Sequence, residues 1–593
     1  MSDDDRPIVS VITEVGALRR PLDYRVPEGF TGPIEVGSRV RVPLHGRSVQ
    51  GWIVGPGSGE TQVESILEVS RSMGFGPPPP VVELCAWAAW RWSGTMSRFL
   101  GTASSPTNVK ALPVRRSAAI AVASGSGLSK RGSSLALESG AVVEHLGPAT
   151  DPIDLVIGFA AAAQARGGSV VVLVPGLGYA GRLTRRLAGR GVPAVSLADG
   201  WDAARAGWPI VVGTRTAAFA PVPHLAGMLV LDAEDERFRS EAAPTWSAVD
   251  VTIERARRAA VPAVLVTSCP PPALALLDDE RSEPRADVRG GWPAIVVADR
   301  TDADPRTGWL SEELARMGST ALEEQPDGIA VACILNRTGR AKLLACRRCG
   351  ELARCDACDA AVALGEEGLV CPRCAAERPT ICAACGGTAM KRLRPGTAQL
   401  AEELSGLLGV PTAEVTAATT PGELDGVRAV VGTEAIVHRV RRSRLVVFLD
   451  LDSQLLASRP GAELSTLALI GRAGRMVGGR DREDHGAVIL QTRLVDHPVV
   501  MAAIHGDPAP VVSGDLELRR SLGLPPFRSA AVLKGPGASV LAEACSSLGV
   551  QQRSLDEGRI ALMAADSTAL ADALERAGRP KERVTVSVDA EIA

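Results

Sequence analysis

Eight of the twelve cysteines lie within forty residues, and their spacing constrains the fold more than any other feature of the sequence. They form four consecutive C-x2-C pairs: Cys346 and Cys349, Cys355 and Cys358, Cys371 and Cys374, and Cys382 and Cys385. Each pair can form a tight turn that offers two thiolates to one tetrahedral zinc ion. The segment therefore predicts a small module with two zinc ions, and three ways of pairing the four turns remain open.

Clustered cysteines in a reducing compartment are typical of metal binding, because cytosolic cysteines seldom form disulfides. The acidic start, Met1–Arg6, lacks the apolar core of a signal peptide, and no run of about 18 apolar residues occurs. We therefore expect a cytoplasmic protein with no membrane partner. Because eight thiolates fill two coordination shells, the ions are expected to be structural and not catalytic. The other four cysteines are expected to be buried apolar residues: Cys85, Cys269, Cys333 and Cys545.

The rest of the pattern predicts a multidomain α/β protein, since 593 residues correspond to about three to five domains. Residues 8–57 alternate in short β-like runs and predict a small β-rich domain. From about residue 141, buried β-branched runs alternate with helical stretches, as in doubly wound lobes with a parallel sheet. The expected boundaries are 1–105 for the N-terminal domain, 106–140 for a linker, 141–285 for the first lobe, 286–510 for the second lobe with the cysteine module at 346–385, and 511–593 for a small α/β C-terminal domain.

The net charge of the whole chain does not indicate whether it binds nucleic acid, because 65 basic and 68 acidic residues give a net charge of −3. Residues 431–480 differ, with eight arginines and four acidic residues. A local basic excess of this kind is a candidate phosphate-binding surface, and ordinary solvated charge is the alternative. The closely spaced candidates are Arg439, Arg441, Arg442 and Arg444.

Several ordered strings resemble the replication-restart (primosomal) helicase family, PriA, of helicase superfamily 2. Asp23 with Tyr24, and Gly37–Pro43, are similar to the family's N-terminal domain, which binds the 3′ end of a nascent DNA strand. Similar strings follow at 213–221, 336–339, 394–397, 432–433, 471–475 and 523–527. The resemblance covers nearly the whole chain, and the ordered cysteine array is its most specific part. Only six of the 65 basic residues are lysines, which fits a divergent, actinobacterial-type member with GC-rich coding.

The resemblance implies two RecA-like helicase lobes, with a ribbon-like two-zinc insertion in the second. It implies a nested pairing of the cysteine turns, with Cys346, Cys349, Cys382 and Cys385 on one zinc and Cys355, Cys358, Cys371 and Cys374 on the other. It also assigns Asp23 to the terminal base or sugar of the DNA, with a simple turn residue as the alternative, and Gly46 to a close backbone approach. The implied partners are forked or gapped DNA with a 3′ strand end, other restart proteins, single-stranded-DNA-binding protein, and the replicative helicase or its loader.

The phosphate loop departs from the family. An ATPase of this class needs G-x4-G-K-S/T, in which N–H groups and a lysine hold the phosphates and a hydroxyl binds Mg²⁺. The corresponding stretch is Gly147–Asp154, in which Ile153 stands at the lysine position and Asp154 at the hydroxyl position. Two prolines in it have no N–H to donate, and Asp151 and Asp154 place negative charge where a triphosphate would lie. The winged-helix domain expected in the family before the first lobe is also missing from residues 106–140.

The second motor element departs in the same direction. Asp232 could still hold Mg²⁺, but Ala233 replaces the glutamate that would position the attacking water. Arg472 and Arg475 stand at arginine-finger positions, and a structural or DNA-phosphate role is the alternative. We expect weak or absent binding of ATP and Mg²⁺ and no hydrolysis, hence a restart protein that binds DNA at stalled or repaired forks and supports primosome assembly without helicase activity. The alternatives are an ATP-dependent 3′–5′ DNA helicase and a zinc protein that serves only as an interaction platform.

Overall fold

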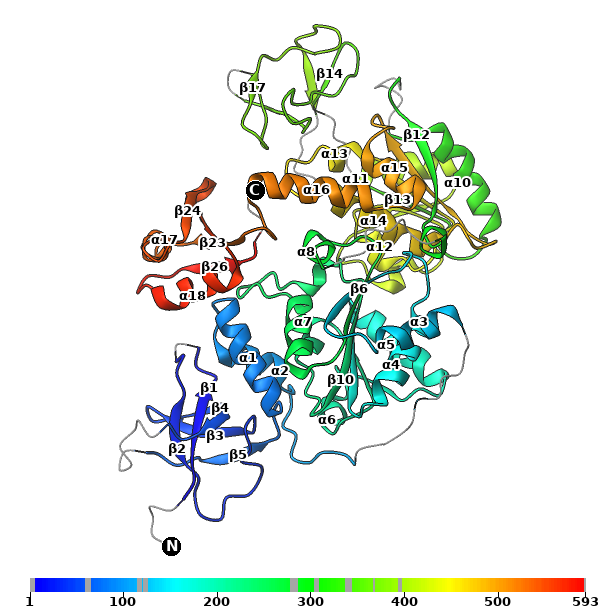
Figure 1. Cartoon of the computed structure of the whole chain (residues 1–593). Coiled ribbons are helices and arrows are strands. Elements are labelled where there is room, and N and C mark those ends of the chain that lie inside the picture. Colours follow the sequence, from blue (N-terminus) through cyan, green and yellow to red (C-terminus); the bar gives the residue numbers. More distant parts are fainter. Residues whose placement is uncertain are drawn as a thin grey trace. The chain divides into compact units, whose positions relative to one another are not determined.

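The computed structural model describes residues 6–16, 18–58, 66–114, 120, 126–277, 286–302, 309–335, 344–365, 368–392 and 397–590 (Figure 1). The chain separates into two compact units: Met1–Glu144, Asp151–Val266 and Gly523–Ile592 form the first, and His145–Thr150 and Thr267–Leu522 the second. The strings at 336–339 and 394–396 lie outside the described residues. Among the helices that are described, none combines the length and apolar character needed to cross a membrane.

The N-terminal part of the first unit is a five-stranded antiparallel sheet, as the alternating runs predict. Its strand order is β2 (Leu22–Arg25), β1 (Ile8–Thr13), β4 (Arg47–Pro56), β3 (Arg39–Leu44) and β5 (Arg71–Gly74). Alternation along β3 places Val40 and Val42 in the apolar core and turns Arg39 and Arg41 to the other face. This second face is partly covered, because Trp52, the cross-strand partner of Arg39, is 6% exposed and its indole donates to Ser104.

The first lobe contains a six-stranded sheet in the order β6 (Ala141–His145), β11 (Ala263–Thr267), β10 (Leu225–Leu231), β7 (Ser169–Leu173), β9 (Ile210–Gly213) and β8 (Ala194–Ser196). The pairs from β11 to β8 are parallel, and β7, β9 and β11 are wholly buried. Helices α4 (Ile153–Gln164) and α5 (Leu177–Gly189) cover one face, and α7 (Ala248–Ala259) covers the other (Figure 1). Strands buried on both faces explain the continuous β-branched runs.

Helix α3 (Gly127–Leu135) forms inside residues 106–140, which the sequence predicts to be a linker. It crosses α4 at very short range, because a Cβ atom at Gly132 would lie 2.2 Å from the carbonyl oxygen of Leu155. On the other helix, a Cβ atom at Gly158 would lie 2.0 Å from the carbonyl oxygen of Ser129. Glycine lowers the intrinsic stability of a helix. Here the two glycines allow α3 and α4 to pack closely, and this packing stabilises α3.

The C-terminal part of the first unit is a four-stranded antiparallel sheet packed against two helices. The strand order is β24 (Gln551–Ser554), β25 (Ile560–Ala564), β23 (Ser529–Lys534) and β26 (Thr585–Val588), with α17 (Ala538–Ser546) and α18 (Ser567–Ala577). This domain is bonded to helix α1 (Pro79–Arg91) near the N-terminus. The Trp90 indole donates to Asp572 at 2.9 Å, and Arg91 donates to Asp589 at 2.9 Å.

The second unit contains the second lobe, whose sheet is parallel throughout. Its strand order is β12 (Ala294–Asp299), β22 (Ala487–Thr492), β21 (Leu445–Phe448), β13 (Val331–Ile334), β20 (Ala429–Gly432) and β19 (Thr412–Val415). Helices α10 (Glu312–Glu324) and α11 (Thr397–Leu408) contribute Leu314 and Leu404 to the core beneath the sheet. Both sheets have the architecture expected of RecA-like lobes, so the predicted fold class is confirmed.

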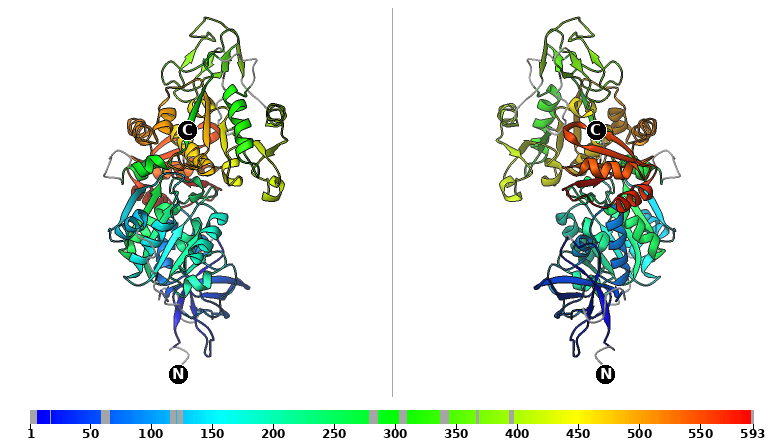
Figure 2. Two further views of the ribbon diagram at one scale, coloured as in Figure 1. Left: turned by 90° about the vertical axis from the view of Figure 1, so that its right-hand side faces the viewer. Right: turned by 90° about the vertical axis from the view of Figure 1, so that its left-hand side faces the viewer.

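The cysteine-rich module is inserted between β13 and α11 and stands at one end of the second unit (Figures 1 and 2). Strands β14 (Leu344–Cys346) and β18 (Met390–Arg392) pair at its base. A three-stranded sheet lies within it, formed by β15 (Ala363–Leu364), β16 (Leu369–Val370) and β17 (Glu377–Arg378). Its main buried cluster consists of seven residues: Leu344, Ala353, Cys355, Ala360, Val362, Leu369 and Cys371. A core this small needs a further source of stability.

Candidate metal centres and nucleic-acid interface

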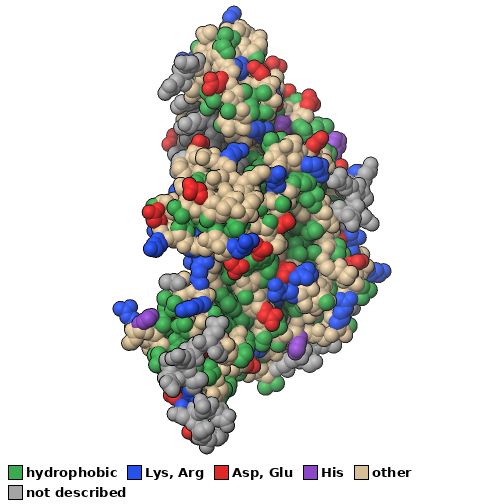
Figure 3. Space-filling view, turned by 60° about the vertical axis from the view of Figure 1, so that its left-hand side comes forward, with side chains coloured by type: hydrophobic (Ala, Val, Ile, Leu, Met, Phe, Trp, Pro, Cys, Tyr) green, Lys and Arg blue, Asp and Glu red, His purple; other side chains and the backbone are tan. Residues whose placement is uncertain are grey.

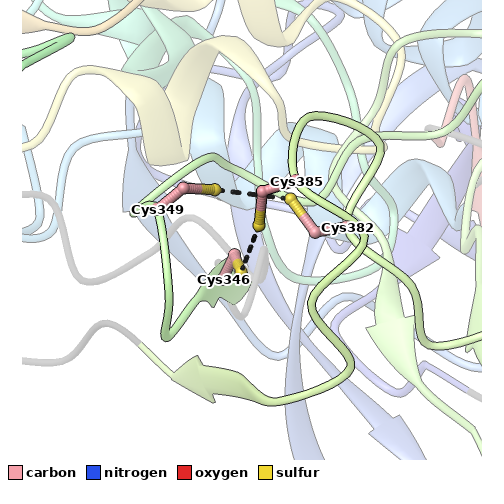
Figure 4. Close-up of side chains that lie close together, drawn as sticks. All are labelled: Cys346, Cys349, Cys382 and Cys385. Atoms are coloured by element: carbon pink, nitrogen blue, oxygen red, sulfur yellow. Dashed lines mark hydrogen bonds between the residues drawn. The ribbon is translucent and has the colours of Figure 1, made fainter.

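The structure brings the eight predicted ligands into two groups of four. The outer group is Cys346, Cys349, Cys382 and Cys385, and the inner group is Cys355, Cys358, Cys371 and Cys374. Within each group all four Sγ atoms lie within 4.8 Å of one another. Figure 4 shows the outer thiols pointing toward one another, with Cys346 Sγ 3.6 Å from that of Cys385 and Cys349 Sγ 3.5 Å from that of Cys382. Of the three possible pairings, the structure has the nested one.

The sulfur positions fit tetrahedral zinc. A Zn–S distance of about 2.3 Å places the sulfurs of a regular tetrahedron about 3.8 Å apart. In the inner group the Sγ atoms of Cys355 and Cys374, and those of Cys358 and Cys371, are 3.5 Å apart. Four thiolates leave no open position for a substrate, so the geometry suits a structural ion. The two clusters are therefore compatible with two zinc ions per chain.

Backbone N–H groups in the turns stabilise the thiolate form of two ligands. The N–H groups of Cys349 and Arg348 lower the pKa of the Cys346 thiol to about 7, and the Arg348 nitrogen lies 3.4 Å from its Sγ. In the inner group, the N–H of Ala376 is the first of several donors that lower the pKa of Cys374 to about 7. A thiol with a lowered pKa loses its proton to a metal more readily at neutral pH.

Arg373, in the third C-x2-C turn, joins the module to the second lobe. Its guanidinium donates to the carbonyl oxygens of Ala457 at 3.1 Å and Ser458 at 3.4 Å. Beside it, the carbonyl oxygen of Leu456 accepts from the N–H of Ala361 at 2.9 Å. The inner cysteine group thus shapes the surface that meets the lobe. This role of Arg373 could not be predicted from the sequence, because an arginine that binds backbone carbonyl groups leaves no signal in the residues it binds.

His497, next to this module, should make stability depend on pH. Its Nδ1 accepts from the N–H of Val499 at 3.2 Å at the start of α15 (Pro498–His505), and burial is the main cause that lowers its pKa to about 4. Since this value lies below that of an unfolded histidine, about 6.5, stability is lost as the pH falls from about 6.5 toward 4.

We expect the free energy of unfolding of wild type to fall by about 1 kcal/mol more than that of His497→Asn between pH 7 and pH 5.5. Asparagine retains an acceptor for the helix N-terminus but does not titrate. Urea denaturation at the two pH values measures the difference, and protonation of the zinc ligands affects both proteins alike. Equal losses would show that His497 is not the titrating group.

The loop that corresponds to a phosphate loop is held by internal hydrogen bonds. The Ala149 N–H donates to the carbonyl of Gly291 at 2.9 Å, and the Thr150 N–H donates to the carbonyl of Gly147 at 3.0 Å. Gly147 and Gly291 are also too closely packed for a side chain, since a Cβ atom at Gly147 would lie 2.7 Å from the Cα atom of Gly291. N–H groups that would bind phosphate oxygens are therefore engaged elsewhere.

The later residues of the stretch Gly147–Asp154 do not fit a nucleotide either. Asp151 forms an ion pair with Arg186, and Asp154 lies 3.4 Å from Arg190. The Ile153 N–H donates to the Asp151 carboxylate at 3.2 Å, and the Ile153 side chain is only 3% exposed. The lysine position thus faces the apolar core, so the stretch lacks the groups that bind the phosphates of Mg–ATP.

The other motor positions are also occupied by structural contacts. Asp232 follows β10 with a φ of 60°, and Ala233 is 5% exposed. On α14 (Ala462–Val477), Arg475 donates from Nε to the carbonyl of Pro148 at 2.8 Å, which is an acceptor within its own unit. Arg472 lies one turn earlier on the same helix. At least one of the two arginine-finger positions therefore has an internal partner.

The two residues assigned to DNA contact in the N-terminal domain differ in how accessible they are to a DNA strand. They are Asp23 and Gly46. Asp23 is 8% exposed, and its carboxylate accepts from the hydroxyl of Ser10 and from both the N–H and the hydroxyl of Ser58, at 2.6 to 3.1 Å. Gly46 lies at the tip of the β3–β4 hairpin with a φ of 75°, and a Cβ atom there would meet nothing within 4 Å. Gly46 is thus explained by the turn, and contact of either residue with DNA stays a prediction.

Three of the four clustered arginines of the second lobe already have partners within the protein. Arg439 donates to the carbonyl of Ala417, Arg442 pairs with Asp484 at 2.9 Å, and Arg444 pairs with Glu324 at 2.5 Å. Arg441 is exposed. On the face shown in Figure 3, basic and acidic side chains are likewise interspersed. A phosphate-binding role for this cluster remains a prediction.

Comparison with known proteins decides the family. The family model described as the PriA 3′ DNA-binding domain matches residues 10–105. The probable replication restart protein PriA of Mycobacterium tuberculosis is 27% identical over 618 residues, which cover 88% of this chain and 86% of that protein. This chain belongs to the PriA family. The PriA protein of Haemophilus influenzae is 29% identical over 421 residues, covering 64% of this chain and 56% of the relative, so that match spans little more than half of the relative's length.

The matched PriA segment contains the N-terminal sheet, α1 and α2 (Met96–Ala103). Among solved structures, a variant of Saccharomyces cerevisiae Dbp5 bound to RNA and ADP BeF3 matches with a TM-score of 0.36 and 12% sequence identity, over 66% of this chain and 93% of that chain. A likeness at this level supports no statement about the function of the PriA-family chain.

Proposed function

We propose that this PriA-family chain binds DNA at stalled or repaired replication forks and supports assembly of the restart machinery without acting as a helicase. Recognition of DNA is assigned to the N-terminal domain, which matches a family of 3′ DNA-binding domains. The observation that carries the non-motor assignment is the stretch 147–154, where N–H groups and carboxylates are engaged internally and no lysine is present.

The two lobes then serve as a scaffold for the zinc module and for partner surfaces. The proposed partners are other replication-restart proteins, single-stranded-DNA-binding protein, and the replicative helicase or its loader, in the cytoplasm at the nucleoid. Eight cysteine thiolates hold two zinc ions in the proposed state, and these ions supply structure and no chemistry.

An ATP-dependent 3′–5′ DNA helicase is the second candidate, because both RecA-like lobes and Asp232 are retained. A retained fold does not by itself imply a retained activity. Ala233 has no carboxylate to orient a water molecule, and Ile153 has no charge to stabilise a phosphate. These two positions belong to separate elements, so a working ATPase would need two independent replacements.

An ATPase assay on the purified full-length protein separates the two candidates. With forked or single-stranded DNA, we expect ATP turnover at the level of the Asp232→Ala variant and no strand separation. We also expect no rise in thermal midpoint when millimolar Mg–ATP is added, because only a bound ligand stabilises the folded state. Robust turnover that disappears in Asp232→Ala would establish the helicase instead.

DNA binding is tested separately with labelled forks in a gel-shift assay. We expect tighter binding to a fork that presents a free 3′ strand end than to blunt duplex of the same length. Equal binding to both would favour a zinc protein that acts only as an interaction platform.

A further inference from the structure

Two arginines face each other across neighbouring strands of the N-terminal sheet. Arg41 on β3 is the direct antiparallel partner of Arg71 on β5, so their Cβ atoms are about 5 Å apart. Among the described residues, neither has a carboxylate partner. Arg41 Nη1 reaches only the carbonyl oxygen of Ser48 at 3.4 Å, its Nε is buried without an acceptor, and the Arg71 side chain is exposed.

Arg39, on the same strand and face, shows how this domain uses an arginine for structure. It donates to two carbonyl oxygens in segment 105–107, at 2.9 and 3.1 Å, and to Gln50 Oε1 at 3.0 Å. Burial lowers the pKa of its guanidinium. Gln50 also lies directly opposite Arg41, but bonds to Arg39. Arg39 therefore has a structural role. Arg41 and Arg71 remain cations that a ligand can reach.

Like charges directly opposite each other destabilise a sheet, and an anion between them removes the repulsion. We propose that Arg41 and Arg71 together bind the phosphate backbone of a DNA strand. Two guanidinium groups side by side offer several N–H donors in rigid forks, which match the oxygens of a phosphodiester. The site recognises the charge of the DNA backbone and not the base sequence, because phosphate contacts position a strand without identifying its bases.

The domain that holds the pair favours a DNA strand over a small anion, because residues 10–105 match the family of PriA 3′ DNA-binding domains. Ser10 and Asp23, which lie opposite each other on β1 and β2, are on the same face of the sheet as Arg41 and Arg71. Between them that face is covered at Ile12 and Trp52, which are 2% and 6% exposed, so a strand that contacts the arginines does not run straight across β1 and β4. The inference rests on the proposed function, in which the N-terminal domain binds a 3′ strand end.

The experiment uses full-length protein and a fluorescein-labelled fork with a 3′-hydroxyl end, titrated by fluorescence anisotropy at several salt concentrations. Arg41→Gln and Arg71→Gln should each weaken binding roughly three- to ten-fold and reduce the steepness of log K against log salt by about 1. The matched control is Arg553→Gln, an exposed arginine on β24 in the C-terminal domain, which should bind like wild type.

Two readouts distinguish a backbone site from the end site and from a structural role. The affinity ratio between 3′-hydroxyl and 3′-phosphate forks should be the same in Arg41→Gln, Arg71→Gln and wild type. The thermal midpoint should not fall in these variants, whereas Arg39→Gln should lower it, because three acceptors lose their donor.

Wild-type affinity and salt dependence in the Arg41→Gln, Arg71→Gln double variant would overturn this inference and leave the proposed function intact. A wild-type protein that binds no fork DNA would overturn both. If the double variant lost affinity for an acidic peptide but not for DNA, the site would belong to a protein partner, and the inference would be wrong.

Discussion

Replacing Cys355 by serine is expected to halve the zinc content of the protein and to unfold its cysteine-rich module. The Sγ atom of Cys355 lies 3.5 Å from that of Cys374, and a serine hydroxyl is a much weaker zinc ligand than a thiolate. A structural zinc site contributes on the order of 10–16 kcal/mol of apparent binding free energy at pH 7, which in such modules is folding free energy. Cys355 and Cys371 also belong to the module's main buried cluster, so loss of the ion removes ligand and core together.

Metal analysis by mass spectrometry should therefore give two zinc ions per wild-type chain and one per Cys355→Ser chain. Limited proteolysis should show a new tryptic cleavage after Arg373, which no longer holds the carbonyl groups of Ala457 and Ser458. Cys545→Ala is the matched control, because Cys545 is fully buried but lies outside both groups. A Cys355→Ser protein with two tightly bound zinc ions would refute the nested assignment.

The module and the lobes could be predicted because their signals are local. Two residues between cysteines set a metal-binding turn by themselves, and a continuous run such as Ser169–Leu173 already specifies a strand that is buried on both faces. The pairing of the four turns needed either the family resemblance or the structure. Spacing alone does not reveal which turns meet in space.

Contacts between remote side chains could not be predicted. The Arg41–Arg71 pair depends on the register of β3 against β5, which shifts at a bulge between Arg39 and Val40. A slip of one residue would turn Arg41 toward the core, and nothing in the local sequence fixes that choice. A strand with arginines on alternate positions still signals a basic face, so the residue types were visible although their partner was not.

For the phosphate loop, the sequence indicates only part of the physical reason to expect weak nucleotide binding. The sequence predicts that Asp151 and Asp154 repel a triphosphate, but Arg186 and Arg190 pair with both carboxylates. These pairs are exposed and each contributes little, yet they offset the negative charge. The stronger argument against nucleotide binding is that backbone donors such as the Ala149 N–H already have acceptors.

Removing the Asp589 carboxylate is expected to destabilise the first unit strongly. Asp589 accepts from Arg91 at 2.9 Å and from the indole of Trp92 at 3.1 Å. The side chains of Arg91 and Asp589 are 11% and 18% exposed, so Asp589→Ala leaves a nearly buried cation and an indole N–H without acceptors. Breaking a buried pair by removing one partner costs about 3–5 kcal/mol, and partial solvent access reduces this to about 2–4 kcal/mol. Urea denaturation followed by tryptophan fluorescence measures the change.

Asp572→Ala is the matched control on the same interface. It also removes a carboxylate that accepts from an indole, that of Trp90 at 2.9 Å, but this bond is exposed and water can replace it. We expect a loss below about 1 kcal/mol. Similar losses for Asp572→Ala and Asp589→Ala would mean that apolar packing, and not the buried ion pair, attaches the C-terminal domain.

Asp589→Asn separates the charge from the hydrogen bonds. Asparagine tolerates the positive φ of 56° at this position and keeps one acceptor oxygen. Asp250, a partly exposed residue nearby, has its pKa raised by desolvation and then by the charge of Asp589, so the variant should lower that pKa. An Asp250 that ionises more readily helps to balance Arg91, so the loss of stability should be smaller for asparagine than for alanine. A carboxyl group whose pKa is raised in the folded state costs stability as the pH rises above about 4, where the unfolded group ionises. Wild type should therefore lose more stability than Asp589→Asn over that range. If the two proteins followed the same pH profile, Asp250 and Asp589 would not be coupled, and the cost of the alanine variant would be that of the lost acceptors alone.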